Sequence, residues 1–224
     1  MTNITAVTAS APPRSVVAGS RARRGPIARA TRAAGRDLAY LTGVLGTSIL
    51  GFVAWTVGVS LALSLSVLVI GALLWVAVAG GLRITVDLDR RLVGWYRDTS
   101  LKGRYRHQLG GNFTAYLKTT LTDPRVWADL RWLVLNSVFG FVAATVALAV
   151  TVEVISLVAM PLWWWAISDP HHQYATLNLG IYTVTSTGWA LVTAALGLAL
   201  APIAIGINRA LARVHSRVAQ RYLV

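Results

Sequence analysis

The sequence predicts an all-α membrane protein, a polytopic bundle of about four transmembrane helices built from two similar hairpins. Residues 38–82 contain no Asp, Glu, Lys or Arg, although one helix needs only roughly 20 apolar residues to cross a bilayer. A second stretch, 132–168, carries a single charged residue, Glu153. Charged residues make up 13% of the chain, whereas a soluble domain carries about 25%.

The two apolar blocks share a sequence pattern, which indicates an internal repeat. Asp37-Leu38 at the start of the first block matches Asp129-Leu130 at the start of the second. Gly-Phe-Val-Ala then occurs at residues 51–54 and again at residues 140–143. Because the elements recur in the same order, we expect the hairpins to be two copies of one unit.

The basic residues predict which side of the membrane each segment occupies. All 21 Lys and Arg residues fall within 14–36, 83–131 and 209–221. Lys and Arg concentrate in cytoplasmic loops, so we expect a multi-pass protein of the cell membrane with both termini and the central loop in the cytoplasm. The net charge of +13 then favours anionic lipid headgroups as partners and gives no reason to expect nucleic acid.

The first half of the chain divides into three predicted parts. Residues 1–36 are rich in Arg, Ala, Ser and Thr and contain no acid, which predicts a disordered cytoplasmic tail. The first hairpin covers 37–82, with helices at about 40–59 and 62–82. Residues 83–128 form the cytoplasmic loop, where apolar residues at helical spacing from Ile84 to Trp95 predict amphipathic helices.

The second unit, 129–208, has two possible topologies. Asp123-Pro124 predicts a helix start, because Asp accepts hydrogen bonds from free amides and Pro is tolerated at the first position. We expect a helix from 132 to about 151, an outer loop at about 160–187 opened by Pro161, and a last descending helix. A fifth span at 154–165 is the alternative, but it would put the C-terminal arginines outside.

Residues 209–222 predict a basic amphipathic helix. Arginine recurs every four residues and forms one cationic stripe: Arg209, Arg213, Arg217 and Arg221. The stripe suits contact with lipid headgroups or with a partner protein. The segment is either the headgroup-bound end of the last helix or a coupling helix that transmits the movement of that span.

Polar and aromatic residues predict a sensing surface on the outer face. Glu153 is the only acid inside a long apolar block, and an ionisable residue within a membrane segment is a functional hypothesis by default; a solvated position among outer headgroups is the alternative. Three consecutive tryptophans suit a membrane interface. Asp169 and the His pair after it could respond to pH or metal, or form a plain exposed loop. The candidate residues are Glu153, Trp163, Trp164, Trp165, Asp169, His171 and His172.

The composition offers no support for enzymatic chemistry. The chain has no Cys, which excludes disulfides and thiolate chemistry, and no catalytic, cofactor or metal motif stands out. We therefore predict a protein that is not an enzyme and uses no cofactor.

Four motifs together resemble a known family. They are residues 36–41 (Arg-Asp-Leu-Ala-Tyr-Leu), 123–130 (Asp-Pro-Arg-Val-Trp-Ala-Asp-Leu), 160–165 (Met-Pro-Leu-Trp-Trp-Trp) and 208–213 (Asn-Arg-Ala-Leu-Ala-Arg). Over about residues 35–222 the chain is similar to the "putative sensor" domain of actinobacterial membrane proteins. In that family the domain often precedes the catalytic part of a two-component histidine kinase.

The resemblance implies a free-standing sensor. The sequence has no phosphoacceptor His in a kinase motif and no Gly-rich ATP site, so it implies a membrane sensor or signal-relay protein that works with a separate partner, such as a histidine kinase or another signalling protein. The alternative is a subunit of a membrane transporter or channel, because transporters often contain repeats. The ligand is left open, as is association of the chain with itself.

Overall fold

Over the residues that it describes, the structure is all-α with one short pair of strands. The computed structural model describes residues 26–65, 69–100, 122–167, 175–176, 183–184 and 186–223. Strands β1 (Ala175–Thr176) and β2 (Thr183–Val184) pair antiparallel, with Ala175 opposite Val184. The helices are α1 (Pro26–Ser64), α2 (Val69–Arg97), α4 (Pro124–Leu135), the π-helical turn η1 (Asn136–Gly140), α5 (Phe141–Ile167) and α6 (Thr187–Leu223).

Local signals at the helix ends explain where two of these elements begin and stop. Asp123 caps α4, because its Oδ1 accepts a hydrogen bond from the Arg125 amide at 2.9 Å, and Pro124 follows at the first helical position. This confirms the helix start predicted from Asp-Pro. At the end of α2, Asp98 has a φ of 53° and the Thr99 amide bonds the Gly94 carbonyl at 3.0 Å, which is a Schellman stop.

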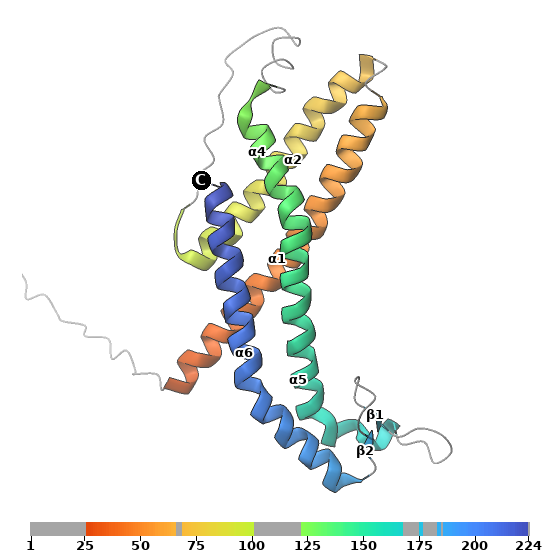
Figure 1. Cartoon of the computed structure of the whole chain (residues 1–224), viewed down its shortest axis with the longest axis vertical. Helices are drawn as coiled ribbons and strands as arrows, with labels where there is room; N and C mark the ends of the chain where they lie inside the picture. The colour runs from red at the N-terminus through yellow and green to blue at the C-terminus, as the bar shows by residue number, and fades with distance from the viewer. Residues whose placement is uncertain are drawn as a thin grey trace, which may run out of the picture.

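The helices form two hairpins that diverge from a shared centre. The most extensive helix contacts are those of α1 with α2 and of α5 with α6. The ends where α1 meets α2 and where α5 meets α6 lie at opposite ends of the long axis (Figure 1). We expected both turns on one outer face, so this arrangement differs from the prediction. The reason is that α4 packs on α1 and α2. Helix α5 continues from α4 through η1 and runs away from the end where α1 meets α2.

Two predicted boundaries are wrong. The tail was expected to extend to residue 36, but α1 begins at Pro26, since Pro suits the first helical turn and the Ala- and Arg-rich stretch after it has high helix propensity. The outer loop was expected from residue 160, but α5 continues through Pro161 to Ile167. Pro161 removes one donor without ending this apolar helix, as is common in membrane helices.

Other predicted helices are present. Helix α2 continues beyond the apolar block to Arg97, and α6 includes the whole basic segment 209–222. Residues 1–25 of the predicted tail and 101–121 of the predicted central loop lie outside the described residues.

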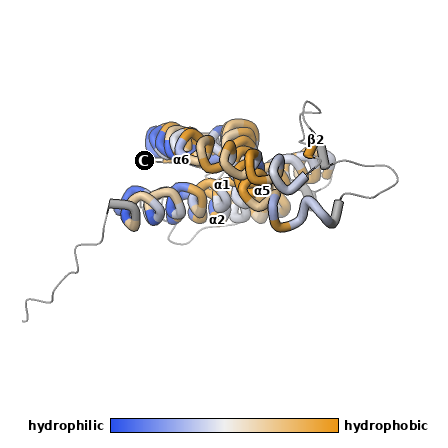
Figure 2. Tube along the Cα trace, turned by 90° about the horizontal axis from the view of Figure 1, so that it is seen from below, coloured by the Kyte–Doolittle hydropathy of each residue, from blue (hydrophilic) through white to orange (hydrophobic). Residues whose placement is uncertain are grey.

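The surface of the long helices is apolar to a degree that suits a bilayer. Among the described residues, three helical stretches, 28–64, 124–165 and 187–223, are long and apolar enough to cross a membrane. Large apolar side chains on them are exposed, such as Leu162 at 78% and Leu198 at 63%. Figure 2 shows hydrophilic residues gathered at the C-terminal end of α6 and the N-terminal end of α1, and hydrophobic residues along much of the long helices. Such extensive apolar exposure is a liability in water and is favourable in lipid.

One core joins the long helices at the centre. It combines residues 40–62 of α1 with most of α2 and with parts of α4, α5 and α6. Its largest fully buried apolar members are Tyr40, Leu41, Val44, Leu82, Val86, Val93, Trp132 and Leu133.

Candidate functional site

A cluster of buried polar side chains lies where α1, α2, α4, η1 and α6 meet. We call it the polar junction. Each member is at most 2% exposed, so each must find its hydrogen-bond partners inside the protein. Its members are Tyr40, Asp89, Trp132, Asn136 and His215.

Hydrogen bonds join the polar junction into one chain. The Tyr40 hydroxyl lies 2.8 Å from His215 Nδ1, and His215 Nε2 lies 2.8 Å from Asn136 Oδ1. Asn136 Nδ2 donates to Asp89 Oδ2 at 3.1 Å, and Trp132 Nε1 donates to the same oxygen at 2.8 Å. The chain therefore connects α1 through α6 and η1 to α2.

The chain has a direction that the carboxylate fixes. An ionised Asp89 only accepts hydrogen bonds, so Asn136 turns its amide nitrogen toward Asp89 and its oxygen toward His215. His215 must then donate from Nε2, and in the neutral ring Nδ1 accepts from Tyr40. The network thus assigns the Nε2-protonated tautomer, and every donor points toward the acid.

The π-helical turn η1 places Asn136 in the polar junction. Such turns widen a helix locally and occur often at functional sites. Gly140, at the end of η1, is in close contact with α1, because a Cβ there would clash with Asn136 Oδ1 and would lie 2.6 Å from Ser48 Oγ. Only glycine therefore leaves room for the Asn136 amide beside α1.

Three ion pairs flank the polar junction. Arg90 bonds Asp129 at 3.1 Å with both side chains 5% exposed, and also bonds the more exposed Asp87 at 2.7 Å. Asp37 accepts from Arg209 at 3.4 Å and from the Tyr96 hydroxyl at 2.7 Å. Arg90 Nε further donates to the Leu223 carbonyl at 3.4 Å. Helix α6 is therefore tied to both α1 and α2.

The contacts across the polar junction are reciprocal between the hairpins. Asp37 of α1 pairs with Arg209 of α6, and Asp129 of α4 pairs with Arg90 of α2. Three residues after each Asp, an aromatic residue makes a second contact across the hairpins: Tyr40 with His215, and Trp132 with Asp89.

Burial raises the pKa of Asp89, the acid of the polar junction. Asp89 lies in α2 beyond Leu82, where the predicted second membrane span ends. Burial raises the pKa of Asp89 to about 6, against the lowering effect of hydrogen bonds from Thr47 and Trp132 and of the charge of Arg90. Burial therefore favours the protonated form of Asp89 more than water does. Among the described residues, no three His, Asp or Glu side chains form a group that could hold a metal ion.

A family model described as "Putative sensor" matches residues 40–223. The chain belongs to this sensor family. The matched region includes every member of the polar junction, so the junction belongs to the family domain itself. No curated protein and no solved structure matches the chain.

The structure separates the residues predicted for the outer-face sensing surface. Glu153 is half-buried in α5, about ten residues and thus roughly 15 Å along the helix before the tryptophans. Trp163 and Trp165 are 38% and 66% exposed near the end of α5, whereas Trp164 packs against Met160, Val184 and Ala190. Glu153 and the tryptophans do not form one site. Asp169, His171 and His172 lie outside the described residues.

The arginine stripe of α6 faces outward. Arg213, Arg217 and Arg221 are exposed, and Arg209 is half-exposed beside Asp37. The opposite face of α6 is buried in the bundle through Ala212, His215, Ser216, Ala219 and Leu223.

The members of the polar junction were not predicted from the sequence. One of them, His215, is 1% exposed in α6. A signal was available: arginines at every fourth position mark the solvated face of α6, so the residues one or two positions before each arginine, at 208, 212, 215 and 219, share the buried face. No comparable local signal marks Asp89 or Asn136, whose partners are distant in sequence.

Proposed function

We propose that the protein is an integral membrane sensor or signal-relay protein in which the polar junction couples two membrane hairpins to the C-terminal end of α6. The observation that carries this proposal is the hydrogen-bond chain from Tyr40 to Asp89, which passes through His215 of α6. Membership of the sensor family supports it. A shift of either hairpin changes the contacts of α6, and α6 carries the arginine stripe on its outer side.

In this proposal all four long segments cross the cell membrane, with the apolar part of α2 up to Leu82 as the fourth span. The arginines at both ends of the chain place the termini in the cytoplasm. Because the hairpins diverge (Figure 1), crossing one bilayer requires them to swing toward each other about the polar junction. Reporter fusions at residue 1 and residue 224 should both be active only in the cytoplasm; an external C-terminus would refute the four-span topology.

The reciprocal ion pairs favour an origin by duplication. Each pairs the Asp that opens one repeat, Asp37 or Asp129, with an arginine in the second helix of the other. The repeated Asp-Leu motifs therefore have equivalent contacts as well as equivalent sequence positions.

The output of the relay is a contact made by the exposed face of α6. The exposed arginines of α6 suit an acidic surface of a separate signalling partner, such as the histidine kinase of a two-component system, or anionic headgroups. The chain itself supplies the relay and not the catalytic step. Loss of the stripe, through Arg213→Gln, Arg217→Gln and Arg221→Gln together, should abolish partner contact while leaving the polar junction intact.

A distance measurement tests the coupling directly. Because the chain has no Cys, the exposed positions Arg91 on α2 and Arg217 on α6 can be changed to Cys and spin-labelled in the full chain in lipid nanodiscs. With an intact polar junction we expect a narrow distance distribution. Asn136→Ala should broaden it, because His215 and Asp89 lose their common partner.

The control is Thr42→Ala. Thr42 is exposed and its hydroxyl makes a local bond to the Leu38 carbonyl, so its loss should leave the distribution narrow. If Asn136→Ala and Thr42→Ala give the same distribution, the polar junction does not couple α2 to α6.

A further inference from the structure

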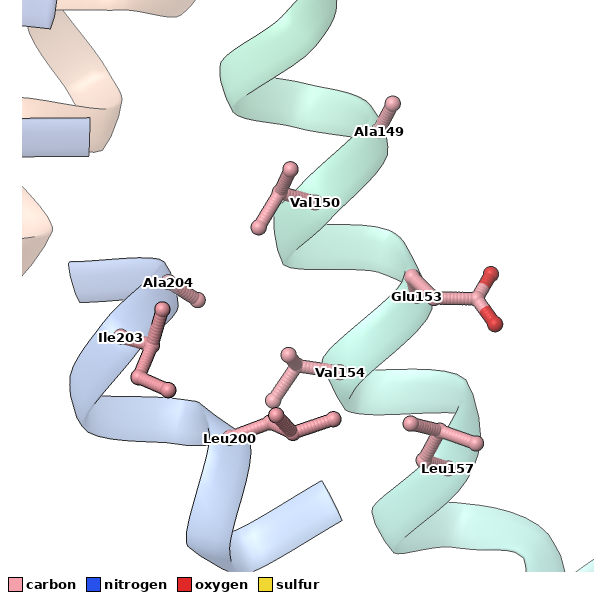
Figure 3. Close-up of a pocket in the computed structure, with 8 residues that line it drawn as sticks. All are labelled: Ala149, Val150, Glu153, Val154, Leu157, Leu200, Ile203 and Ala204. Carbon is pink, nitrogen blue, oxygen red and sulfur yellow. The ribbon is translucent and has the colours of Figure 1, made fainter. Parts of the chain in front are cut away.

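Helix α6 consists of two parts with different surroundings. From Thr187 to Ile207 it has no charged residue and pairs with α5, so that both helices line one groove (Figure 3). The hydrogen bond from Asn208 Nδ2 to Thr151 Oγ1, at 2.8 Å, marks the end of this part. The remainder, 209–223, contains the arginine stripe and is bonded to α1 and α2.

The end of the stripe lies beyond the headgroups of a membrane that α6 crosses. Residues 187–207 are just long enough for a hydrocarbon core, which takes roughly 20 residues, and the headgroup layer on each side is only about 5–8 Å thick. Because a helix rises about 1.5 Å per residue, Arg217 lies about 15 Å and Arg221 about 21 Å past Ile207 along α6. A tilt of about 40° reduces the second distance only to about 16 Å.

Helix α2 leads to the same conclusion from the other hairpin. Arg90 Nε donates to the Leu223 carbonyl at the end of α6. Arg97 Nε donates to Ser216 Oγ at 3.1 Å. Along α2, Arg90 lies about 12 Å and Arg97 about 22 Å beyond Leu82, where the apolar part ends. The segment that carries the stripe is therefore fixed outside the headgroup layer of both hairpins.

The chain supplies no acid to the exposed arginines of the stripe. No ion pair among the described residues includes Arg213, Arg217 or Arg221. Nearby acids that form ion pairs do so with other arginines: Asp37 with Arg209, Asp87 and Asp129 with Arg90, and Asp98 with Arg36. The charge of the stripe is thus available to an external anion.

Apolar side chains lie beside the arginines. Val214 follows Arg213 and Tyr222 follows Arg221, and the two apolar side chains are 46% and 49% exposed. Consecutive residues are about 100° apart around a helix, so each flanks the arginine before it. Outside the membrane, exposed apolar side chains beside cations indicate a protein contact. A second helix lying along α6 would repeat its side chains at the same spacing as the stripe.

We propose that the outer face of α6 from Val214 to Tyr222 binds an acidic amphipathic helix of a separate signalling protein. Acidic residues at four-residue spacing on that helix meet Arg217 and Arg221, and its apolar row covers Val214 and Tyr222. Apolar anchors at helical spacing supply the contact area, and charge pairs at the edge set the orientation. This inference rests on the proposed sensor function and names the chemistry of its partner.

Binding of a designed peptide tests this face. The full chain in phosphatidylcholine nanodiscs is titrated with a fluorescent helical peptide that carries Glu at every fourth position beside a row of Leu, and with its Gln counterpart. Empty nanodiscs provide the blank. The Glu peptide should bind, and the Gln peptide should bind about tenfold more weakly. Failure of the Glu peptide to bind would overturn the proposed face.

Two double variants locate the contact. Arg217→Gln with Arg221→Gln should weaken binding of the Glu peptide by about tenfold. Arg29→Gln with Arg32→Gln removes the same charge from exposed positions at the start of α1 and should leave binding unchanged. Equal weakening by both double variants would show attraction to net charge alone and would overturn the site.

A depth measurement separates a protein partner from lipid. Because the chain has no Cys, single spin labels can be placed through Arg217→Cys, Arg221→Cys and, as the lipid-facing control, Leu198→Cys. The first two labels should be accessible to a water-soluble nickel chelate, with or without phosphatidylglycerol in the nanodisc, whereas the control should be protected. Protection of residues 217 and 221 by phosphatidylglycerol would show headgroup binding and would overturn the protein partner. If the Glu peptide fails to bind while Asn136→Ala still broadens the distance distribution, this inference alone is rejected and the relay remains.

Discussion

Substitution of Asp89 separates hydrogen bonding from charge in the polar junction. Asp89 Oδ2 accepts from Trp132 at 2.8 Å and from Asn136 at 3.1 Å. In Asp89→Asn the amide oxygen can accept both bonds, and its nitrogen is placed toward Thr47, which already bonds the carboxylate. Asp89→Leu removes the acceptor and leaves two buried N–H groups without a partner. The two variants should therefore behave differently.

The expected magnitudes follow from these contacts. A buried donor without an acceptor costs about 1–3 kcal/mol, so the free energy of unfolding of Asp89→Leu should lie about 2–6 kcal/mol below that of Asp89→Asn, which keeps both hydrogen bonds. Burial raises the pKa of Asp89 from 3.8 to about 6, and one pKa unit corresponds to about 1.4 kcal/mol. The ionised carboxylate then costs the fold about 3 kcal/mol at neutral pH. Asp89→Asn should recover up to that amount.

The pH dependence has a definite sign. The native protein binds a proton at Asp89 near pH 6, whereas the unfolded chain binds it near 3.8. Between these values the native state holds more protons, so the Asp89 contribution to stability falls as pH rises from about 4 to 6 and is constant above about 7. Asp89→Asn should remove this fall.

Denaturant unfolding in detergent micelles from pH 4 to 8 measures both effects. Asp87→Asn is the matched control, because Asp87 also bonds Arg90 but is 49% exposed. The reasoning is refuted if Leu is tolerated as well as Asn at residue 89, or if Asp89→Asn keeps the pH dependence of the wild-type protein.

Two further substitutions test local features of the fold. Gly140→Ala should destabilise the protein by about 1–3 kcal/mol, because the new Cβ displaces Asn136 Oδ1 and Ser48 Oγ; unfolding curves equal to wild type would exclude the proposed close contact. Asp123→Ala should cost about 1 kcal/mol through loss of the cap on the Arg125 amide, whereas Asp123→Ser should restore most of it, since Ser also caps helices.

Features with a local cause were predictable from the sequence. The start of α4 follows from Asp123-Pro124, and the extension of α2 to Arg97 follows from apolar residues at helical spacing. The outward arginine stripe of α6 follows in the same way from a four-residue repeat. Each depends on side chains within one or two helical turns, so no knowledge of the tertiary structure is needed.

Features with a non-local cause were not predictable. The polar junction joins residues 43 to 175 positions apart in sequence, and no spacing rule relates them. The continuation of α5 through Pro161 was also not predictable, since a helix continues through Pro only when its surroundings tolerate one missing hydrogen-bond donor. The divergence of the hairpins also depends on tertiary contacts, because it follows from the packing of α4 on α1 and α2.

The reciprocal contacts imply that neither hairpin is stable alone. Without the second half, Asp37 and Tyr40 of α1 lose Arg209 and His215, and Arg90 loses its buried partner Asp129. Breaking a buried ion pair typically costs about 3–5 kcal/mol, a large share of the stability of a small domain. We therefore expect residues 1–110 and 111–224, expressed separately, to be degraded or to aggregate, and to accumulate as a one-to-one complex when co-expressed. Arg90→Gln together with Arg209→Gln should weaken that complex, whereas Arg91→Gln with Arg217→Gln, which changes exposed arginines, should not. Stable accumulation of either half by itself would show that the contacts across the polar junction are dispensable, and the coupling between the hairpins would then need another origin.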